Sequence, residues 1–122
     1  MSDLSQFTES VPTRPLRKEE RELICVLLSR VSASAALENT LSASCVTDMD
    51  DGGMGSIQFV QPEPRIFGKE LAEAEYVDSD GVLVSIALNA DSNGQLFELD
   101  FWKVDFSPLR RYPKPSDLVA KG

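Results

Sequence analysis

Histidine is absent from the 122 residues of this sequence. Its absence excludes a Cys-His or Ser-His nucleophile pair and any metal site that uses histidine ligands. An enzyme built on this chain would have to use carboxylates, lysine, tyrosine or a bare thiol. We therefore predict that the protein is not an enzyme and that it carries no cofactor.

Cysteines are also scarce, since the chain has only Cys25 and Cys45. Two cysteines this far apart form neither a disulfide framework nor a zinc ligand set. Cys25 falls inside an apolar helical stretch and Cys45 opens a predicted strand. We expect both to be small, buried side chains with reduced thiols.

Long hydrophobic runs are missing as well. The longest are far shorter than the roughly 20 residues needed to cross a bilayer. The first ten residues, MSDLSQFTES, have neither the basic start nor the apolar stretch of a secretory signal. These absences predict a cytoplasmic protein with no membrane partner.

Basic residues are few in the middle of the chain. The whole sequence has a net charge of −8 and a pI near 4.4. From Glu38 to Asp105 there are fourteen acidic and three basic residues, a net charge of −11, whereas the flanks carry +3. Repulsion from phosphate disfavours nucleic acid as a partner. A basic protein partner is favoured.

The length is close to the commonest size of a single domain. Hydrophobic residues make up 42% and charged residues 26% of the chain, which is typical of a globular protein. We predict a flexible leader over residues 1–13, one domain over 14–113 and a flexible tail over 114–122.

An amphipathic helix is predicted to begin near Arg17. Its apolar stripe comprises Leu23, Ile24, Leu27, Leu28 and Val31, which recur at helical spacing. Acidic residues in the first turns and Arg30 in the last suit the helix dipole. The following segment, SASAALENTLSAS, predicts a short second helix.

From Cys45 onward the apolar residues alternate, which predicts strands. The predicted strands are CVTDMD, MGSIQFV, ELAEAEYVD, VLVSIALNAD and LFELDFWKVDF. Asp-Gly and Asn-Gly pairs between several of them are strong hairpin signals, and such short loops join antiparallel neighbours. We therefore predict an α+β fold in which the two helices pack on a largely antiparallel, five-stranded meander sheet.

The alternation also assigns the strand residues to two faces. The face opposite the apolar residues receives Glu73, Glu75, Ser85, Glu98 and Asp100. Like charges that face each other across strands cost up to about 1 kcal/mol per pair. Such a face either keeps the sheet soluble or forms an acidic docking surface.

Aromatic residues near these acids favour the docking interpretation, because tryptophan is enriched in interface hot spots. A single tryptophan in a small domain is also compatible with a place in the core. The predicted partner-binding residues are Glu73, Glu75, Tyr76, Glu98, Asp100 and Trp102, with Trp102 or Tyr76 as the aromatic anchor.

The segment NADSNGQLFELD has the spacing of a calcium loop. Asn89, Asp91 and Asn93 fall at positions 1, 3 and 5, and Asp100 falls at position 12. Against a calcium loop, position 1 is not aspartate, position 12 is not glutamate, and the flanks predict strands. A hairpin turn through Ser92–Gly94 explains the same residues. A calcium-binding or small-ligand domain stays as an alternative.

Two other acidic segments are interpreted as turns. DMDDGGMGS predicts a hairpin turn with a glycine bulge, and Asp78–Gly81 predicts a second turn. The pairs Glu98 with Asp100 and Glu73 with Glu75 do not predict acid–base catalysis, since an exposed strand provides neither a cleft nor a raised pKa.

The chain from Arg14 to Pro113 resembles an uncharacterised family of small bacterial proteins. The resemblance lies in RPLRKEERELI, DMDDGGMGSIQF, YVDSDGVLVSIALNADSNGQLFELDFWKVDFSPL and the closing Arg-Tyr-Pro. It implies a fold and a bacterial source but no activity. In size, acidity and layout the chain is also similar to immunity proteins that neutralise bacterial toxins.

The function predicted from these observations is that of an acidic protein-binding module. Its most concrete form is an immunity protein that docks on a cationic toxin, with complementary charge that speeds association. Besides the calcium or small-ligand domain, a different alternative is an acidic DNA mimic that blocks a DNA-binding protein. An enzyme that uses a perturbed carboxylate, Cys25 or Cys45 ranks last.

Overall fold

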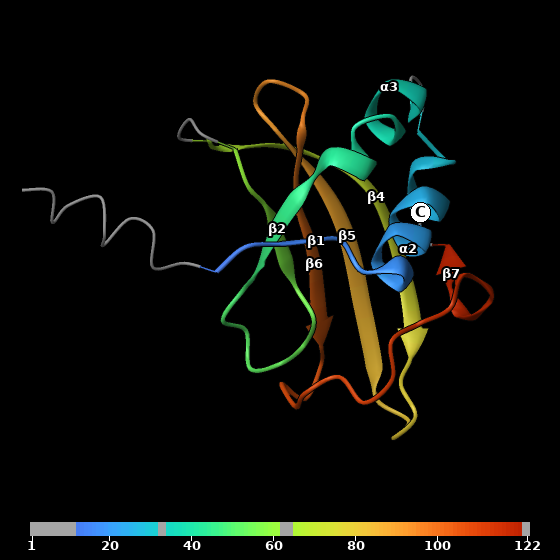
Figure 1. The fold of residues 1–122 in the computed structure, drawn as a ribbon. Coiled ribbons are helices and arrows are strands. Elements are labelled where there is room, and N and C mark those ends of the chain that lie inside the picture. Colours follow the sequence, from blue (N-terminus) through green and yellow to red (C-terminus); the bar gives the residue numbers. More distant parts are fainter. Residues whose placement is uncertain (1–11, 32–33, 62–64, 121–122) are drawn as a thin grey trace, which may run out of the picture.

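A computed structural model describes residues 12–31, 34–61 and 65–120. In it, two helices pack on one face of an antiparallel sheet, so the predicted α+β fold is confirmed (Figure 1). The leader predicted over residues 1–13 lies almost wholly outside the described residues. No helix in the described ranges is both long and apolar enough to cross a membrane.

Helix α2 spans Lys18–Leu28, close to the predicted bounds. It begins where the backbone N–H of Arg17 donates to Glu20 Oε1 at 2.8 Å, which satisfies one of the free donors of the first turn. Its buried stripe contains the four leucine and isoleucine residues that periodicity predicts. The second helix, α3, spans Ser34–Glu38, and a 3₁₀ turn, η1, follows at Leu41–Ala43.

Seven strands form the sheet within the described residues. They are β1 (Arg14–Pro15), β2 (Cys45–Asp48), β3 (Ile57–Phe59), β4 (Phe67–Val77), β5 (Leu83–Asp91), β6 (Leu96–Lys103) and β7 (Val119–Ala120). The five predicted strands correspond to β2–β6. Strands β1 and β7 have two residues each, which is too short for alternation to reveal them.

The strand order is β1-β2-β3-β6-β5-β4-β7, so only β4, β5 and β6 form a simple meander. Strand β3 pairs with β6 and not with β4, its neighbour in sequence. Strands β6 and β5 therefore lie between Phe59, the end of β3, and Phe67, the start of β4. A tight turn could not bridge that distance.

The described part of the tail after Lys114, where the sequence predicts a flexible segment over 114–122, contains a 3₁₀ turn and a short strand. A 3₁₀ turn, η2, spans Pro115–Asp117, and β7 then pairs with β4. Leu118 between them packs against the core. Burial of this apolar side chain and pairing with a sheet edge hold the segment in place, so the folded unit extends to Ala120.

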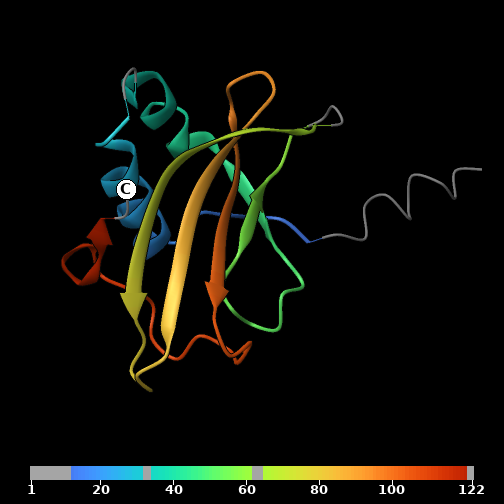
Figure 2. The ribbon, with the colours of Figure 1, turned by 180° about the vertical axis from the view of Figure 1, so that it is seen from behind.

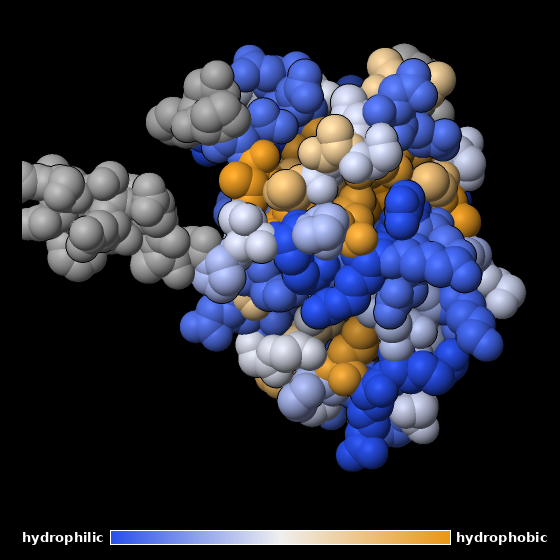
Figure 3. Space-filling model, in the orientation of Figure 1, coloured by the Kyte–Doolittle hydropathy of each residue, from blue (hydrophilic) through white to orange (hydrophobic). Residues whose placement is uncertain are grey.

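The core lies between the sheet and the helices. Ile86 faces Phe101, and Leu88 faces Leu99, across β5 and β6, and the stripe of α2 covers them. Hydrophilic side chains dominate the exterior of the helix side, with hydrophobic ones between them (Figure 3). Seen from behind, the sheet lies in front of both described helices, which leave its other face uncovered (Figure 2).

Candidate functional site

The uncovered side of the sheet, called the open face below, carries most of the predicted partner-binding residues. Its side chains come from alternate positions of three strands: Glu73, Glu75 and Val77 on β4, Leu83, Ser85, Ala87 and Asn89 on β5, and Glu98, Asp100 and Trp102 on β6. The register aligns Glu75, Ser85 and Trp102 in one row. The next row holds Glu73, Ala87 and Asp100.

Asp100 is the most perturbed acid on the open face. Burial, followed by the negative charge of Glu98 and a hydrogen bond with it, raises the pKa of Asp100 to about 6. The Asn89 amide donates to Asp100 Oδ2 at 2.7 Å and only partly offsets this rise. The fold therefore holds two carboxylates together at a cost in stability, which is a common property of functional sites.

Asp100→Asn is expected to raise the free energy of unfolding at pH 7 by about 1 kcal/mol, since solvent screens part of the repulsion it removes. The folded pKa of about 6 lies above the unfolded value of about 3.9, so wild-type stability falls as pH rises between them. The gain from the substitution should thus be full above pH 6 and shrink toward pH 4. Denaturant unfolding at several pH values measures it.

The matched control is Glu38→Gln, which removes one negative charge from an exposed position on α3. Its effect on stability should be small and should not follow the same pH profile. A loss of stability in Asp100→Asn at pH 7 would contradict the assigned repulsion.

A group of exposed hydrophobic residues, called the apolar end below, lies beside the acids of the open face. Trp102 is 50% exposed and Phe106 is 63% exposed. Their rings pack edge to face, with 4.8 Å between the ring centroids. Val77, Leu83 and Val104 are also exposed. Leu83 pairs with Val77 and accepts a backbone hydrogen bond from Val104, so the group is continuous. Such clusters mark interaction surfaces.

The backbone at Phe106 supports a function for this end. Phe106 has a φ of 64°, a left-handed conformation that is rare for a bulky residue. Backbone strain of this kind costs about 1–3 kcal/mol and concentrates at functional sites. Here it accompanies an aromatic side chain that contacts Trp102 instead of entering the core.

Tyr76, in contrast, cannot anchor a partner. It points to the core side of β4, is 1% exposed, and its hydroxyl donates to the Arg111 carbonyl at 2.7 Å. The prediction of Tyr76 as an anchor is therefore wrong. Strand alternation is the reason, since Tyr76 follows the outward Glu75 by one residue.

The residues of the predicted calcium loop form a hairpin and are bound to protein groups. Asp91 Oδ2 accepts a hydrogen bond from Arg65 Nε at 2.8 Å, and Asp91 Oδ1 accepts the N–H groups of Asn93 and Gln95. Asn89 is bonded to Asp100. The described ranges contain no group of three or more potential metal-ligating side chains. The geometry therefore favours the hairpin interpretation.

Both cysteines differ from the buried thiols that the sequence predicts. Cys45 is exposed because it opens β2 on the side away from the core, and Cys25 is half-buried on α2. Both are free. Burial, together with nearby Glu38, raises the pKa of Cys25, which works against a reactive thiolate.

A buried ion network was not predicted from the sequence. Lys103 Nζ lies 2.8 Å from Asp78 Oδ2 and 2.7 Å from Asp80 Oδ2, and the Lys103 side chain is inaccessible to solvent. The acids belong to the turn that the sequence identified, but alternation along β6 was the only signal that Lys103 points inward. This network joins the β4–β5 turn to β6, next to the residues of the apolar end.

The fold and this surface define a small α+β protein with one covered and one open sheet face. The chain belongs to the family described as a domain of unknown function, DUF6984, which matches residues 13–113. Comparison with curated proteins gave no match, and neither did comparison with solved structures. The family match agrees with the resemblance noted from the sequence over nearly the same residues.

Proposed function

We propose that the protein is a binding module that docks a basic protein partner on the open face of its sheet. The observation that supports this most is that acidic side chains and an exposed aromatic side chain share that face. Asp100 precedes the exposed Trp102 by two positions on β6, and Glu75 lies in the row of Trp102 with Ser85 between them. Glu73 lies in the row of Asp100, and Glu98 precedes Asp100 by two positions. Apolar anchors surrounded by charge are typical of protein interfaces.

The acids and the apolar end have separate roles in the proposed docking. The acids attract lysine and arginine side chains and speed the encounter, and salt weakens this effect. Trp102 and Phe106 supply the apolar area that holds the complex once it forms. We propose no catalytic step, no cofactor, and neither nucleic acid nor a membrane as the partner.

The partner's identity separates two more specific functions. An immunity protein against a cationic toxin, and with it a bacterial source, stays a prediction from the sequence. The DNA-mimic alternative has one observation in its favour, because the acids form two lines, on β4 and β6, with β5 between them. Competition by duplex DNA for the captured partner would identify a mimic.

Capture with matched variants tests the docking proposal. Immobilised wild-type protein is exposed to extracts of the source cells at low and high salt, and the retained proteins are identified. The wild-type protein should retain one basic protein in stoichiometric amount, and high salt should weaken this retention. The double variant Glu98→Lys with Asp100→Lys should not retain it. Trp102→Ala should weaken binding of the purified partner about tenfold or more.

The charge control is Glu22→Lys with Glu38→Lys, which changes the net charge equally on the helix side. It should retain the partner. Equal losses in both double variants would show attraction by net charge alone, and retention by the Glu98 and Asp100 variant would refute this surface assignment. Circular dichroism checks that every variant is folded.

A further inference from the structure

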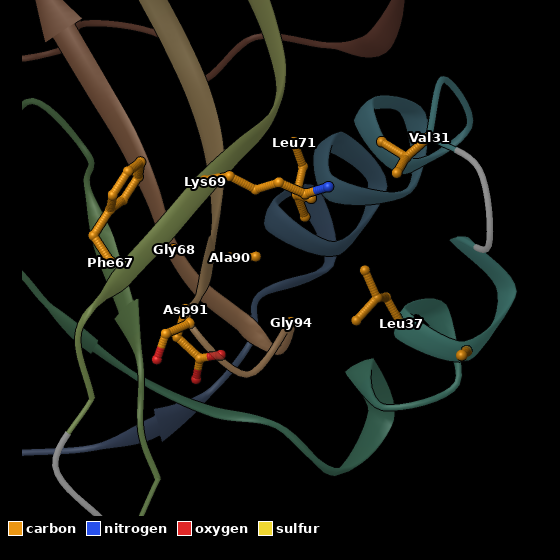
Figure 4. A pocket seen from close by; sticks show the side chains of 11 residues that line it. Val31, Leu37, Phe67, Gly68, Lys69, Leu71, Ala90, Asp91 and Gly94 are labelled. Carbon is orange, nitrogen blue, oxygen red and sulfur yellow. The ribbon is translucent and has the colours of Figure 1, made fainter.

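A cavity of about 680 Å³ lies on the opposite side of the sheet from the docking surface. It is formed where the segment after α2, helix α3, the start of β4 and the β5–β6 turn meet (Figure 4). Val31, Leu37, Leu71 and Ala90 provide much of its lining. A concave, mainly apolar space of this size is typical of a site for a small molecule.

Irregular pairing of β4 places a lysine on this apolar side. Lys69 pairs with Ala90 and Ala72 pairs with Leu88, and both partners are buried on the core face. Residues three apart on one strand share a face only if the strand is interrupted, as it is between Glu70 and Ala72. The irregularity thus turns Lys69 toward the helices.

The position of Lys69 is fixed by a close backbone contact at the preceding residue. A Cβ atom on Gly68 would lie 2.2 Å from the Asp91 carbonyl oxygen, so this position admits only glycine without a shift. Figure 4 shows the Lys69 side chain extending from β4 toward the helices, and Leu71 lines the same cavity. Lys69 is exposed to solvent, and its side chain forms part of the cavity wall.

Lys69 differs from the other two cations of the acidic middle segment. Arg65 is paired with Asp91, and Lys103 is paired with Asp78 and Asp80. Lys69, in contrast, lines the cavity. Asp91 also lines the cavity, but its charge is already engaged by Arg65.

We propose that this cavity binds a small amphipathic monocarboxylate. The ligand's carboxylate pairs with the Lys69 ammonium, and its apolar body, of about eight to ten carbons, packs on Leu37, Leu71 and Ala90. An ammonium over an apolar cavity selects a ligand with one anionic end. A cationic ligand of the same length is excluded by repulsion, and a neutral one binds more weakly.

Calorimetric titration with octanoate and decanoate below their micelle concentrations tests this site. Saturable binding with one ligand per chain is expected, and octylamine should not bind. Lys69→Gln removes the charge but keeps an unbranched polar side chain, and it should weaken octanoate binding about tenfold or more. Lys18→Gln, which changes an exposed lysine on α2, should leave the affinity unchanged.

A second variant tests the apolar wall separately. Leu37→Trp, from α3, should fill the cavity and abolish binding of octanoate while the protein stays folded by circular dichroism. No binding of either acid, equal binding of octylamine, or full affinity in Lys69→Gln would overturn the proposal. The docking variant Glu98→Lys with Asp100→Lys should bind octanoate normally, so the two proposals fail independently.

Discussion

Asp78→Ala is expected to lower the free energy of unfolding by about 3–5 kcal/mol, because it removes one partner of a buried ion pair. The remaining Lys103 ammonium would lie in a place that solvent does not reach. The Asp78 carboxylate also accepts the backbone N–H groups of Arg110 and Arg111. A small domain has only about 5–15 kcal/mol of stability, so the variant should be close to unfolding at 37 °C.

The pKa of Asp78 gives the same network a pH dependence. Burial opposes ionisation, but the N–H of Arg110, the Lys103 ammonium and further N–H groups outweigh it and lower the pKa well below its usual value. A lowered folded pKa gives stability that is present above the unfolded value of about 3.9. That stability is lost as pH falls through the folded value.

Urea unfolding followed by tryptophan fluorescence measures the loss, since Trp102 is the single tryptophan. The matched control is Asp50→Ala, an exposed acid of the β2–β3 loop, which should change stability by less than about 0.5 kcal/mol. The loss of unfolding free energy in Asp78→Asn should lie between those of Asp78→Ala and Asp50→Ala. A small effect of Asp78→Ala would contradict the assigned role of the network.

Arg65→Ala is expected to have the second largest effect, again about 3–5 kcal/mol, since it leaves the buried Asp91 carboxylate unpaired. Arg65 also donates to the carbonyls of Phe59 and Leu96. One guanidinium thus joins β3, the β5–β6 hairpin and β6. Arg65→Lys keeps the charge but cannot reach all three acceptors, so most of the loss should persist.

The measurement is thermal unfolding of Arg65→Ala, Arg65→Lys and a control, Arg30→Ala. Arg30 is an exposed arginine that donates to the Glu73 carbonyl, so its removal should cost about 1 kcal/mol or less. If Arg65→Lys matched the wild type, charge alone and not the branched geometry would account for the stabilisation. If Arg65→Ala matched Arg30→Ala, the buried pair would contribute nothing measurable.

Much of the fold could be predicted because local patterns determine it. The apolar stripe of α2 and the alternation in β5 and β6 follow directly from residue spacing. The pairing of β3 with β6 could not be predicted in this way, since the choice of neighbour depends on packing between distant segments. Strands β1 and β7 were not predicted because two residues are too few to show an alternating pattern.

The candidate site was predictable to a similar extent. Glu73, Glu75, Glu98 and Asp100 share a face because alternation requires it, and the same rule excludes Tyr76. Alternation does not show that Val104 and Phe106 extend the exposed cluster beyond β6, since they lie in an irregular segment with a left-handed residue. The side to which Lys69 points depends on an interruption of β4 that leaves no mark in residue spacing.

The pairing of β3 with β6 has a consequence for biosynthesis on the ribosome. When the β2–β3 hairpin leaves the exit tunnel, its permanent neighbour is not yet made, because Glu98 pairs with Gln58 from 40 residues downstream. The β3 edge of the hairpin therefore stays unpaired until β6 is synthesised. Strands β4, β5 and β6, in contrast, can pair with one another as soon as the turns between them have left the tunnel. A distant pairing of this kind slows folding and exposes nascent chains to aggregation. Premature termination before Leu96 should therefore leave a fragment that depends on chaperones.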